Sequence, residues 1–361
     1  MLSLPKKIPS LRIMFHQIDI NNFRGIKKTS IKGLGQVNLF WGRNNCGKSS
    51  LLDAIFLVAG QSNPLLPVNI NRMRDYRGIS ESDFALNFFN LDEENRIQIT
   101  AYNQQPRSLT ISELHSTSSR VDVLDSSSDL STTQQGKRYG YLLAFSSDGK
   151  GMHSSLILRQ KNEVEIEQKI EVDNHYSERL KCRYINSKYD FQTSVEGLSK
   201  IMANKAEQYI LDALRVVEPT IKDILLSQSD ILVDVGLQRR IPINLLGDGI
   251  RKMLAIASTI YECRDGIVLV DEISNGFHYS VMENLWKVVF KAAQDNNVQI
   301  FASTHDIDSI KGLSKAVRSA ERLPESFVSC FKLQKKDDEL MSFCYTSDQL
   351  EYAIEQEIEM R

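Results

Sequence analysis

The chain has 361 residues, of which 42% are hydrophobic and 25% charged, and its formal net charge is −2. This length allows one large or two ordinary domains, and a charge so close to zero gives no overall signal for nucleic acid. No apolar run is long enough for a signal peptide or a membrane span, and the cysteines at 46, 182, 263, 330 and 344 form no C-x-x-C pair. We therefore expect a cytoplasmic protein without a disulfide framework, a zinc site or a membrane partner.

The first segments of the chain predict strands that lead to one helix. Residues 15–20 alternate as a strand does, 30–32 can pair with them, and 37–41 read as a buried strand. A helix is predicted over 50–59 and a helical turn near 80–90.

Between the buried strand and the helix, residues 42–49 read Gly-Arg-Asn-Asn-Cys-Gly-Lys-Ser and fit the phosphate-binding loop pattern G-x-x-x-x-G-K-[S/T]. Glycines let the backbone curl so that its N–H groups point at an anion, and the helix that follows has a positive N-terminal end. Lys48 would lie between the β- and γ-phosphates, and the Ser49 hydroxyl suits Mg²⁺. The predicted nucleotide-binding residues here are Gly42, Asn44, Asn45, Cys46, Gly47, Lys48, Ser49 and Ser50.

Cys46 allows two interpretations. It is either a redox-sensitive thiol beside the nucleotide or a small residue that fits a tight loop, and we favour the second.

From about residue 96 the hydrophobic period changes to two, which predicts an inserted antiparallel sheet. Its strands are expected at 96–102, 108–111, 139–145, 154–159 and 163–170. Residues 116–135, rich in Ser, Thr, Asp and Gln, predict a mobile surface loop. The longest helical stretch is predicted at 195–226, broken or kinked at Pro219, and a hairpin at 230–244.

The last third alternates helix and strand, which is typical of a parallel α/β sheet. Apolar strands are predicted at 266–270 and 298–302, and helices at 248–261, 279–293 and 306–318. A hairpin of 327–335 with 340–345 and a final helix capped by Ser347 complete the chain.

Asp271 and Glu272 end the first of these apolar strands. Because parallel strands present their carboxyl ends at the ligand crevice, Asp271 is expected to hold Mg²⁺ through water and Glu272 to polarise the attacking water. The plainer interpretation is two acids in a turn. His305 follows the second apolar strand, and we favour a sensor of the γ-phosphate over a structural histidine.

Gly247, Asp248 and Gly249 open the helix before the acidic strand. Glycines at a helix N-terminus can bind an anion. Since the chain already has a phosphate loop, this second site would act on nucleotide held by another copy. A flexible helix cap explains the same residues equally well.

The order of these motifs resembles the ABC-type ATPase heads, including SMC-like and RecF-type DNA-repair ATPases. The closer resemblance is to the ATPase region of OLD-family and related phage-defence ATPases. It rests on the residues 22–26 (Asn-Phe-Arg-Gly-Ile), the phosphate loop, the Gly-Asp-Gly helix start, and Asp271-Glu272 with 276–278 downstream.

The resemblance implies an α/β P-loop NTPase of ABC-ATPase type, with a mostly parallel core sheet, an inserted antiparallel β-subdomain and a helical signature subdomain. Its parts would be an N-terminal lobe (1–95), the insertion with its helical segment (96–245) and a C-terminal lobe (246–361). It also implies head-to-head dimers around two ATP, with Arg24 near the nucleotide edge and His278 where transporter heads carry an aspartate.

Three departures from the family pattern stand out. Gly247 replaces the signature serine, so only backbone donors remain there. The glutamine that joins the core to the inserted sheet has no clear counterpart, and Gln61 is a weak candidate. No Toprim-like acidic cluster and no long run of heptads is visible.

We therefore expect an ATPase, converting ATP and water to ADP and phosphate, with ATP and Mg²⁺ as cofactors. It would act as a dimeric switch for a separate effector, such as a nuclease or toxin in antiphage defence. The alternatives are a RecF/SMC-like DNA-repair ATPase that binds DNA and a non-catalytic ATP-binding scaffold.

Overall fold

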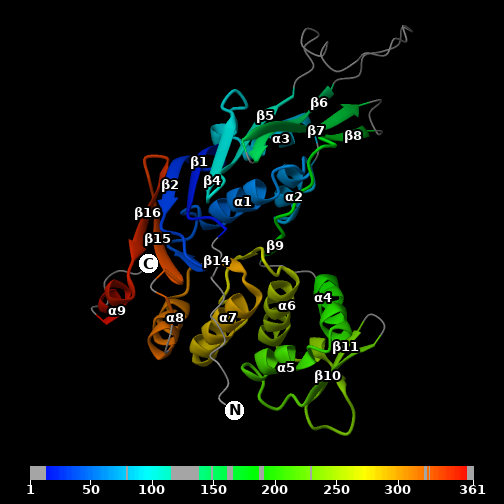
Figure 1. The fold of residues 1–361 in the computed structure, drawn as a ribbon, viewed down its shortest axis with the longest axis vertical. Coiled ribbons are helices and arrows are strands. Elements are labelled where there is room, and N and C mark those ends of the chain that lie inside the picture. Colours follow the sequence, from blue (N-terminus) through cyan, green and yellow to red (C-terminus); the bar gives the residue numbers. More distant parts are fainter. Residues whose placement is uncertain are drawn as a thin grey trace, which may run out of the picture.

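The computed structural model describes residues 14–78, 80–114, 138–147, 149–160, 166–186, 191–227, 230–320, 323–324 and 326–355. The predicted loop at 116–135 lies outside them. Most described strands belong to one sheet with the order β8-β7-β6-β5-β4-β1-β2-β16-β15-β3-β14-β13-β9 (Figure 1). In chain order they are β1 (Gln17–Phe23), β2 (Ile26–Lys32), β3 (Val37–Trp41), β4 (Ile97–Tyr102), β5 (Arg107–Glu113), β6 (Arg138–Ser147), β7 (Lys150–Gln160), β8 (Ile166–Val172), β9 (Cys182–Ile185), β13 (Ile267–Val270), β14 (Gln299–Thr304), β15 (Val328–Lys336) and β16 (Glu339–Tyr345).

The half of the sheet that carries the predicted motifs is parallel. β14 pairs in parallel with both β3 and β13, and β13 pairs in parallel with β9. Every residue of β3, β13 and β14 is buried, as expected for strands covered on both faces. The carboxyl ends of these strands therefore meet at one edge of the sheet.

The other half is antiparallel, and here the prediction needs a correction. The strands predicted after residue 96 exist, but they do not form a separate sheet. β4 pairs antiparallel with β1, with Gln17 opposite Tyr102, so β4 to β8 extend the core sheet. The sheet as a whole is mixed, because sequence period alone does not say which strand a hairpin will join.

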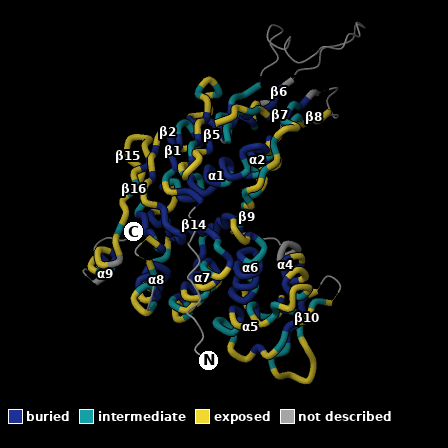
Figure 2. Tube along the Cα trace, in the orientation of Figure 1, coloured by how far each residue is buried: buried dark blue, intermediate teal, exposed yellow. Residues whose placement is uncertain are grey.

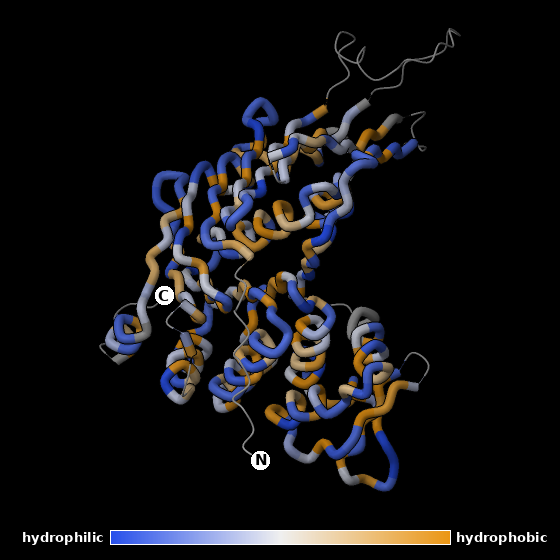
Figure 3. The backbone as a smooth tube through the Cα atoms, viewed as in Figure 1, coloured by the Kyte–Doolittle hydropathy of each residue, from blue (hydrophilic) through white to orange (hydrophobic). Residues whose placement is uncertain are grey.

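Helices cover both faces of the sheet. The helices are α1 (Lys48–Ala59), α2 (Leu66–Arg72), α3 (Glu81–Phe84), α4 (Phe191–Ala203), α5 (Glu207–Arg215), α6 (Asp248–Glu262), α7 (Met282–Asn296), α8 (Ile307–Ser319) and α9 (Ser347–Glu355). One core lies between the sheet and α1, and the other between the sheet and α4 to α8. Figure 2 shows α1 and the inner side of α6 as buried, and Figure 3 shows apolar residues where helices meet the sheet.

The predicted long helix at 195–226 is wrong. α4 ends where Lys205 takes a left-handed backbone (φ +55°) and the Ala206 N–H returns to the Ile201 carbonyl at 3.0 Å, which is a usual helix end. After α5 the chain enters β10 (Asp223–Ser227), which pairs with β11 (Asp230–Asp234), and β11 pairs with β12 (Ile241–Pro242), as the predicted hairpin requires. Within the described residues, no helix has the length and apolar character needed to cross a membrane.

Candidate active site

The phosphate loop lies where β3 meets α1. Gly47 has φ +108°, and a side chain on Gly42 would collide with the Leu333 carbonyl, so both positions require glycine. Lys48 is buried, and its ammonium donates to the carbonyls of Gly42 at 3.0 Å and Arg43 at 3.2 Å. The ammonium of Lys48 is therefore held against the backbone of the phosphate loop.

The acidic pair converges on this loop, as the parallel sheet predicts. The Ser49 hydroxyl donates to the Asp271 carboxylate at 3.2 Å, across more than two hundred residues of sequence. The Lys48 ammonium lies 3.9 Å from the Glu272 carboxylate. Ser49 and Asp271 thus bring two hard oxygen ligands together, a donor set that fits Mg²⁺.

Ser303, near the carboxyl end of β14 beside β13, contacts both acidic residues. Its hydroxyl donates to the Asp271 carboxylate and accepts the Glu272 backbone N–H at 2.9 Å. Glu272 takes a left-handed backbone (φ +49°), which costs a residue with a side chain about 1–2 kcal/mol. Its carboxylate contacts the His305 ring nitrogen at 2.6 Å. The predicted sensor and the predicted water-polarising acid are therefore direct neighbours.

Lys252 of α6 is a site residue that the sequence did not indicate. It is only 4% exposed, and its ammonium donates to the Glu272 backbone carbonyl. Burial lowers the pKa of Lys252 to about 8, although the carboxylates of Glu272 and Asp271 act in the opposite direction. In the sequence, the only sign of a special role for Lys252 is that a lysine stands among the apolar residues of a predicted helix.

A pocket of about 600 Å³ opens beside the loop. It is lined by Gly42, Arg43, Asn44, Ser274, Asn275, Gly276, Phe277, His305, Asp306 and Ile307. Gly42 and Asn44 of the predicted loop, His305 and the turn after the acidic strand therefore line one cavity. Cys46 is buried against this loop, and burial raises the pKa of its thiol, which fits a packing residue better than a reactive one.

Arg24 has a partner that the resemblance did not suggest. Its guanidinium forms an ion pair with the buried Asp53 of α1 and donates to Asn71 at 2.7 Å. Arg74 reaches the same carboxylate at 2.6 Å. Burial raises the pKa of Asp53, and the two arginines oppose that rise. The contact of Arg24 with nucleotide stays a prediction. In the structure its guanidinium is paired with Asp53 of α1.

Gln61, the weak candidate for the linking glutamine, lies beyond the end of α1 that is remote from the phosphate loop. α1 starts in the phosphate loop and is 12 residues long, so Gln61, which follows it, lies about 18 Å from the loop. There it is buried and donates to the Ser146 carbonyl at 3.2 Å.

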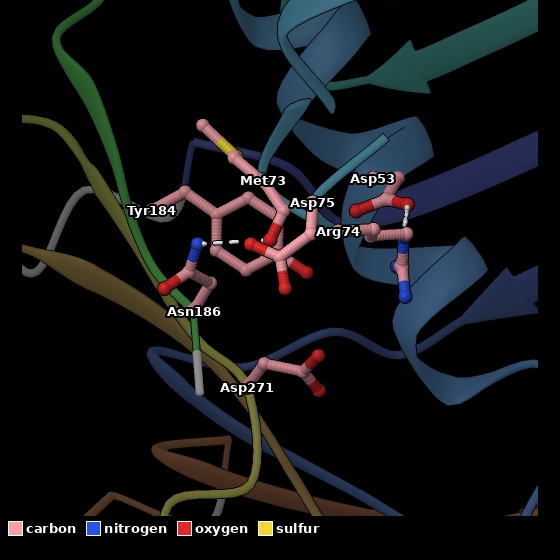
Figure 4. A pocket seen from close by; sticks show the side chains of 7 residues that line it. All are labelled: Asp53, Met73, Arg74, Asp75, Tyr184, Asn186 and Asp271. Carbon is pink, nitrogen blue, oxygen red and sulfur yellow. Dashed lines mark hydrogen bonds and ion pairs between the residues drawn. The ribbon is translucent and has the colours of Figure 1, made fainter. Parts of the chain in front are cut away.

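The residue placed beside the acids is Asn186, which follows β9, a strand that the sequence reading missed. Ile185 pairs with Val270, so Asn186 is level with Asp271. Figure 4 shows the pocket of about 240 Å³ that they line, together with Asp53, Met73, Arg74, Asp75 and Tyr184.

At the start of α6, Gly247 has room for a side chain, whereas Gly249 does not. Around Gly247 there is open space, whereas a side chain on Gly249 would come within 2.6 Å of the Gly276 carbonyl. Gly249 therefore packs the start of α6 onto the turn that lines the pocket. Leu245, two residues before Gly247, and Tyr279, three residues after Gly276, are 73% and 66% exposed.

His278 lies next to Tyr279. Its Nδ1 lies 2.9 Å from the Ser280 hydroxyl, and its ring contacts that of Tyr279.

Comparison with known proteins agrees with this geometry. A protein-family model described as "AAA domain, putative AbiEii toxin, Type IV TA system" matches residues 37–310. A Helicobacter pylori protein named ATP/GTP phosphatase is 25% identical over 369 aligned residues, which cover 95% of this chain and 99% of that protein. An uncharacterized protein of Methanocaldococcus jannaschii is 33% identical over 101 residues, covering 27% of this chain and 46% of that protein.

Among solved structures, an Smc head bound to the C-winged helix domain of ScpA is similar in fold. The TM-score is 0.50 at 11% sequence identity, over 94% of this chain and 99% of that one. The phosphate loop, the acidic strand end and these likenesses together identify an ATP-binding ATPase with the P-loop fold of ABC and SMC heads. The chain belongs to the family of AAA domains described as putative AbiEii toxins of type IV toxin–antitoxin systems.

Proposed function

We propose that this ATPase is a switch in which two copies close head to head around two ATP molecules and open after hydrolysis. One observation carries the proposal. The groups for phosphate, metal and water converge at Lys48, Asp271 and Glu272, while the helix start at Gly247 leaves its open side to solvent. A second copy is the natural source of the nucleotide for that helix start.

In this mechanism each residue has one task. Glu272 orients and polarises the attacking water, and Lys48 offsets the negative charge that develops on the phosphates. Ser49 and Asp271 would hold Mg²⁺, which when bound neutralises phosphate charge. His305, in contact with Glu272, would exchange that contact for one to the γ-phosphate and so report whether ATP is intact.

The surface around Gly247 supports closure between copies. Leu245 and Tyr279 are large apolar side chains left exposed beside the helix start, a composition more typical of interface cores than of free surface. Closure would bury them only when nucleotide bridges both halves, which is the differential contact that a switch requires.

The output of the switch would be a separate effector, a nuclease or toxin in antiphage defence, in the cytoplasm. The family description names a toxin–antitoxin system, and the resemblance to OLD-family ATPases points the same way. DNA is the alternative partner, and binding that weakens steeply with salt would favour it.

The test is Glu272→Gln, measured by light scattering after size exclusion and by phosphate release. Without its carboxylate the water is not polarised, so hydrolysis should fall by about 100-fold or more and ATP should trap a dimer. Lys48→Ala is the control, because it should prevent both ATP binding and dimerisation. A Glu272→Gln protein that remains monomeric with saturating ATP would refute the proposal.

A further inference from the structure

The end of the sheet at β9 is an open edge. β9 is the last strand in the order, and no described strand pairs with its outer side. The carbonyls of Lys181 and Ile185 accept hydrogen bonds from Ile267 and Asp271, both at 2.8 Å. Because parallel ladders alternate, the backbone groups of Cys182 and Tyr184 face the open side. A free edge of this kind is a template for another strand.

A groove runs along this edge. Its volume is about 560 Å³, and it is lined by Phe56, Gly60, Ser62, Asn63, Leu66, Glu178, Arg179, Leu180, Lys181, Cys182, Arg183, Lys200, Glu262 and Cys263. One wall comes from the α1 and α2 side of the sheet and the other from α4 and α6. Figure 1 shows β9 between these two layers.

The groove carries an uncompensated positive charge. Its two acids are already paired, Glu178 with Arg107 at 2.5 Å and Glu262 with Lys200 at 2.5 Å. Arg179, Lys181 and Arg183 are exposed and pair with no acid among the described residues.

Arg183 lies in β9, and Lys181 and Arg179 precede it in the chain at every second position. On an extended chain that spacing repeats about every 7 Å, which is also the spacing of alternate side chains on a neighbouring strand. A partner strand with acids at every second position would therefore place each acid opposite a cation.

We propose that the β9 groove binds an extended acidic segment of a partner protein, which adds to the sheet as one more strand. The open backbone groups supply affinity and the alternating cations supply specificity. Nucleic acid could also bind the cations, but it could not pair with the open backbone groups of β9 as a strand does. The observations therefore favour a peptide.

The groove leads toward the active site. The 240 Å³ pocket continues along the same strand, from Tyr184 to Asn186 and Asp271. A segment seated on β9 would thus end beside the acid expected to hold Mg²⁺. That connection rests on the proposed function, whereas the binding itself does not.

The experiment measures binding without nucleotide, so its outcome is independent of the ATPase switch. The probe is a short fluorescein-labelled peptide in which glutamate alternates with valine, followed by fluorescence anisotropy with the whole chain. We expect saturable binding that the double variant Lys181→Glu/Arg183→Glu weakens about tenfold or more. The matched control is Lys311→Glu/Lys315→Glu, the same charge change at exposed positions of α8, which should leave binding unchanged.

Two further probes distinguish a peptide that pairs as a strand from a ligand held by charge alone and from nucleic acid. The same peptide with every second amide methylated keeps its charge but cannot pair with an edge, so it should not bind. Single-stranded DNA should compete poorly. Equal binding of the methylated peptide, full competition by DNA, or an unaltered affinity in the reversed-charge variant would each overturn the proposal. If that variant melts early by circular dichroism, Lys181→Ala/Arg183→Ala replaces it with the same expected direction.

Discussion

Replacing Lys252 with methionine should slow ATP hydrolysis without weakening the fold. Methionine has nearly the length of lysine and is apolar, so it fits the buried site on α6. What it removes is the ammonium that donates to the Glu272 carbonyl. Glu272 is then free to leave its left-handed backbone, in which its carboxylate faces Lys48 and His305.

The magnitude follows from two terms. A hydrogen bond to a charged group contributes about 1.5–3 kcal/mol, and its loss at Glu272, the proposed water-polarising residue, corresponds to a kcat lower by roughly 10- to 100-fold. For stability, burial lowers the pKa of Lys252 from 10.5 to about 8, so the charged form is disfavoured by about 3 kcal/mol near neutral pH. Methionine removes this penalty together with the hydrogen bond, and the two nearly cancel.

The assay is steady-state phosphate release with a melting curve for each variant. We expect a lower kcat, an unchanged KM for ATP and a melting temperature that does not fall. Lys311→Met, at an exposed position of α8, is the matched control and should change neither quantity. A Lys252→Met protein with normal kcat would show that Glu272 is held by other contacts. A melting temperature lowered by many degrees would show that the lysine is structural.

Three further outcomes are expected. Gly249→Ala should abolish ATP-dependent dimerisation in light scattering and disturb the monomer, because its side chain meets a carbonyl, whereas Gly247→Ala should leave the monomer intact and weaken only the dimer. Arg24→Ala should lower the melting temperature strongly, since it leaves a buried carboxylate short of a partner at a cost of about 3 kcal/mol, and a raised KM with a normal melting curve would instead restore its predicted nucleotide contact. Asn186→Ala should lower kcat several-fold in the phosphate-release assay, while Gln61→Ala should leave kcat unchanged, and the reverse result would contradict the placement of both residues.

The parts of the site that sequence predicts are those set by local pattern. The phosphate loop sits between a buried strand and a helix, and parallel strands must present their carboxyl ends together, so the approach of Lys48 to Glu272 follows. Lys252 and Asn186 could not be found this way. Lys252 acts through a helix packed onto another turn, and Asn186 follows a strand of only four residues, one of them charged. Periodicity carries no information about such contacts.

The order of strands around the phosphate loop has a consequence for synthesis. β3 is flanked by β15, and β16 lies between β15 and β2, so strands made last complete the sheet around a loop made early. The Leu333 carbonyl of β15 forms the wall against Gly42. We therefore expect a nascent chain to carry its complete phosphate-binding motif before the wall that β15 supplies is in place.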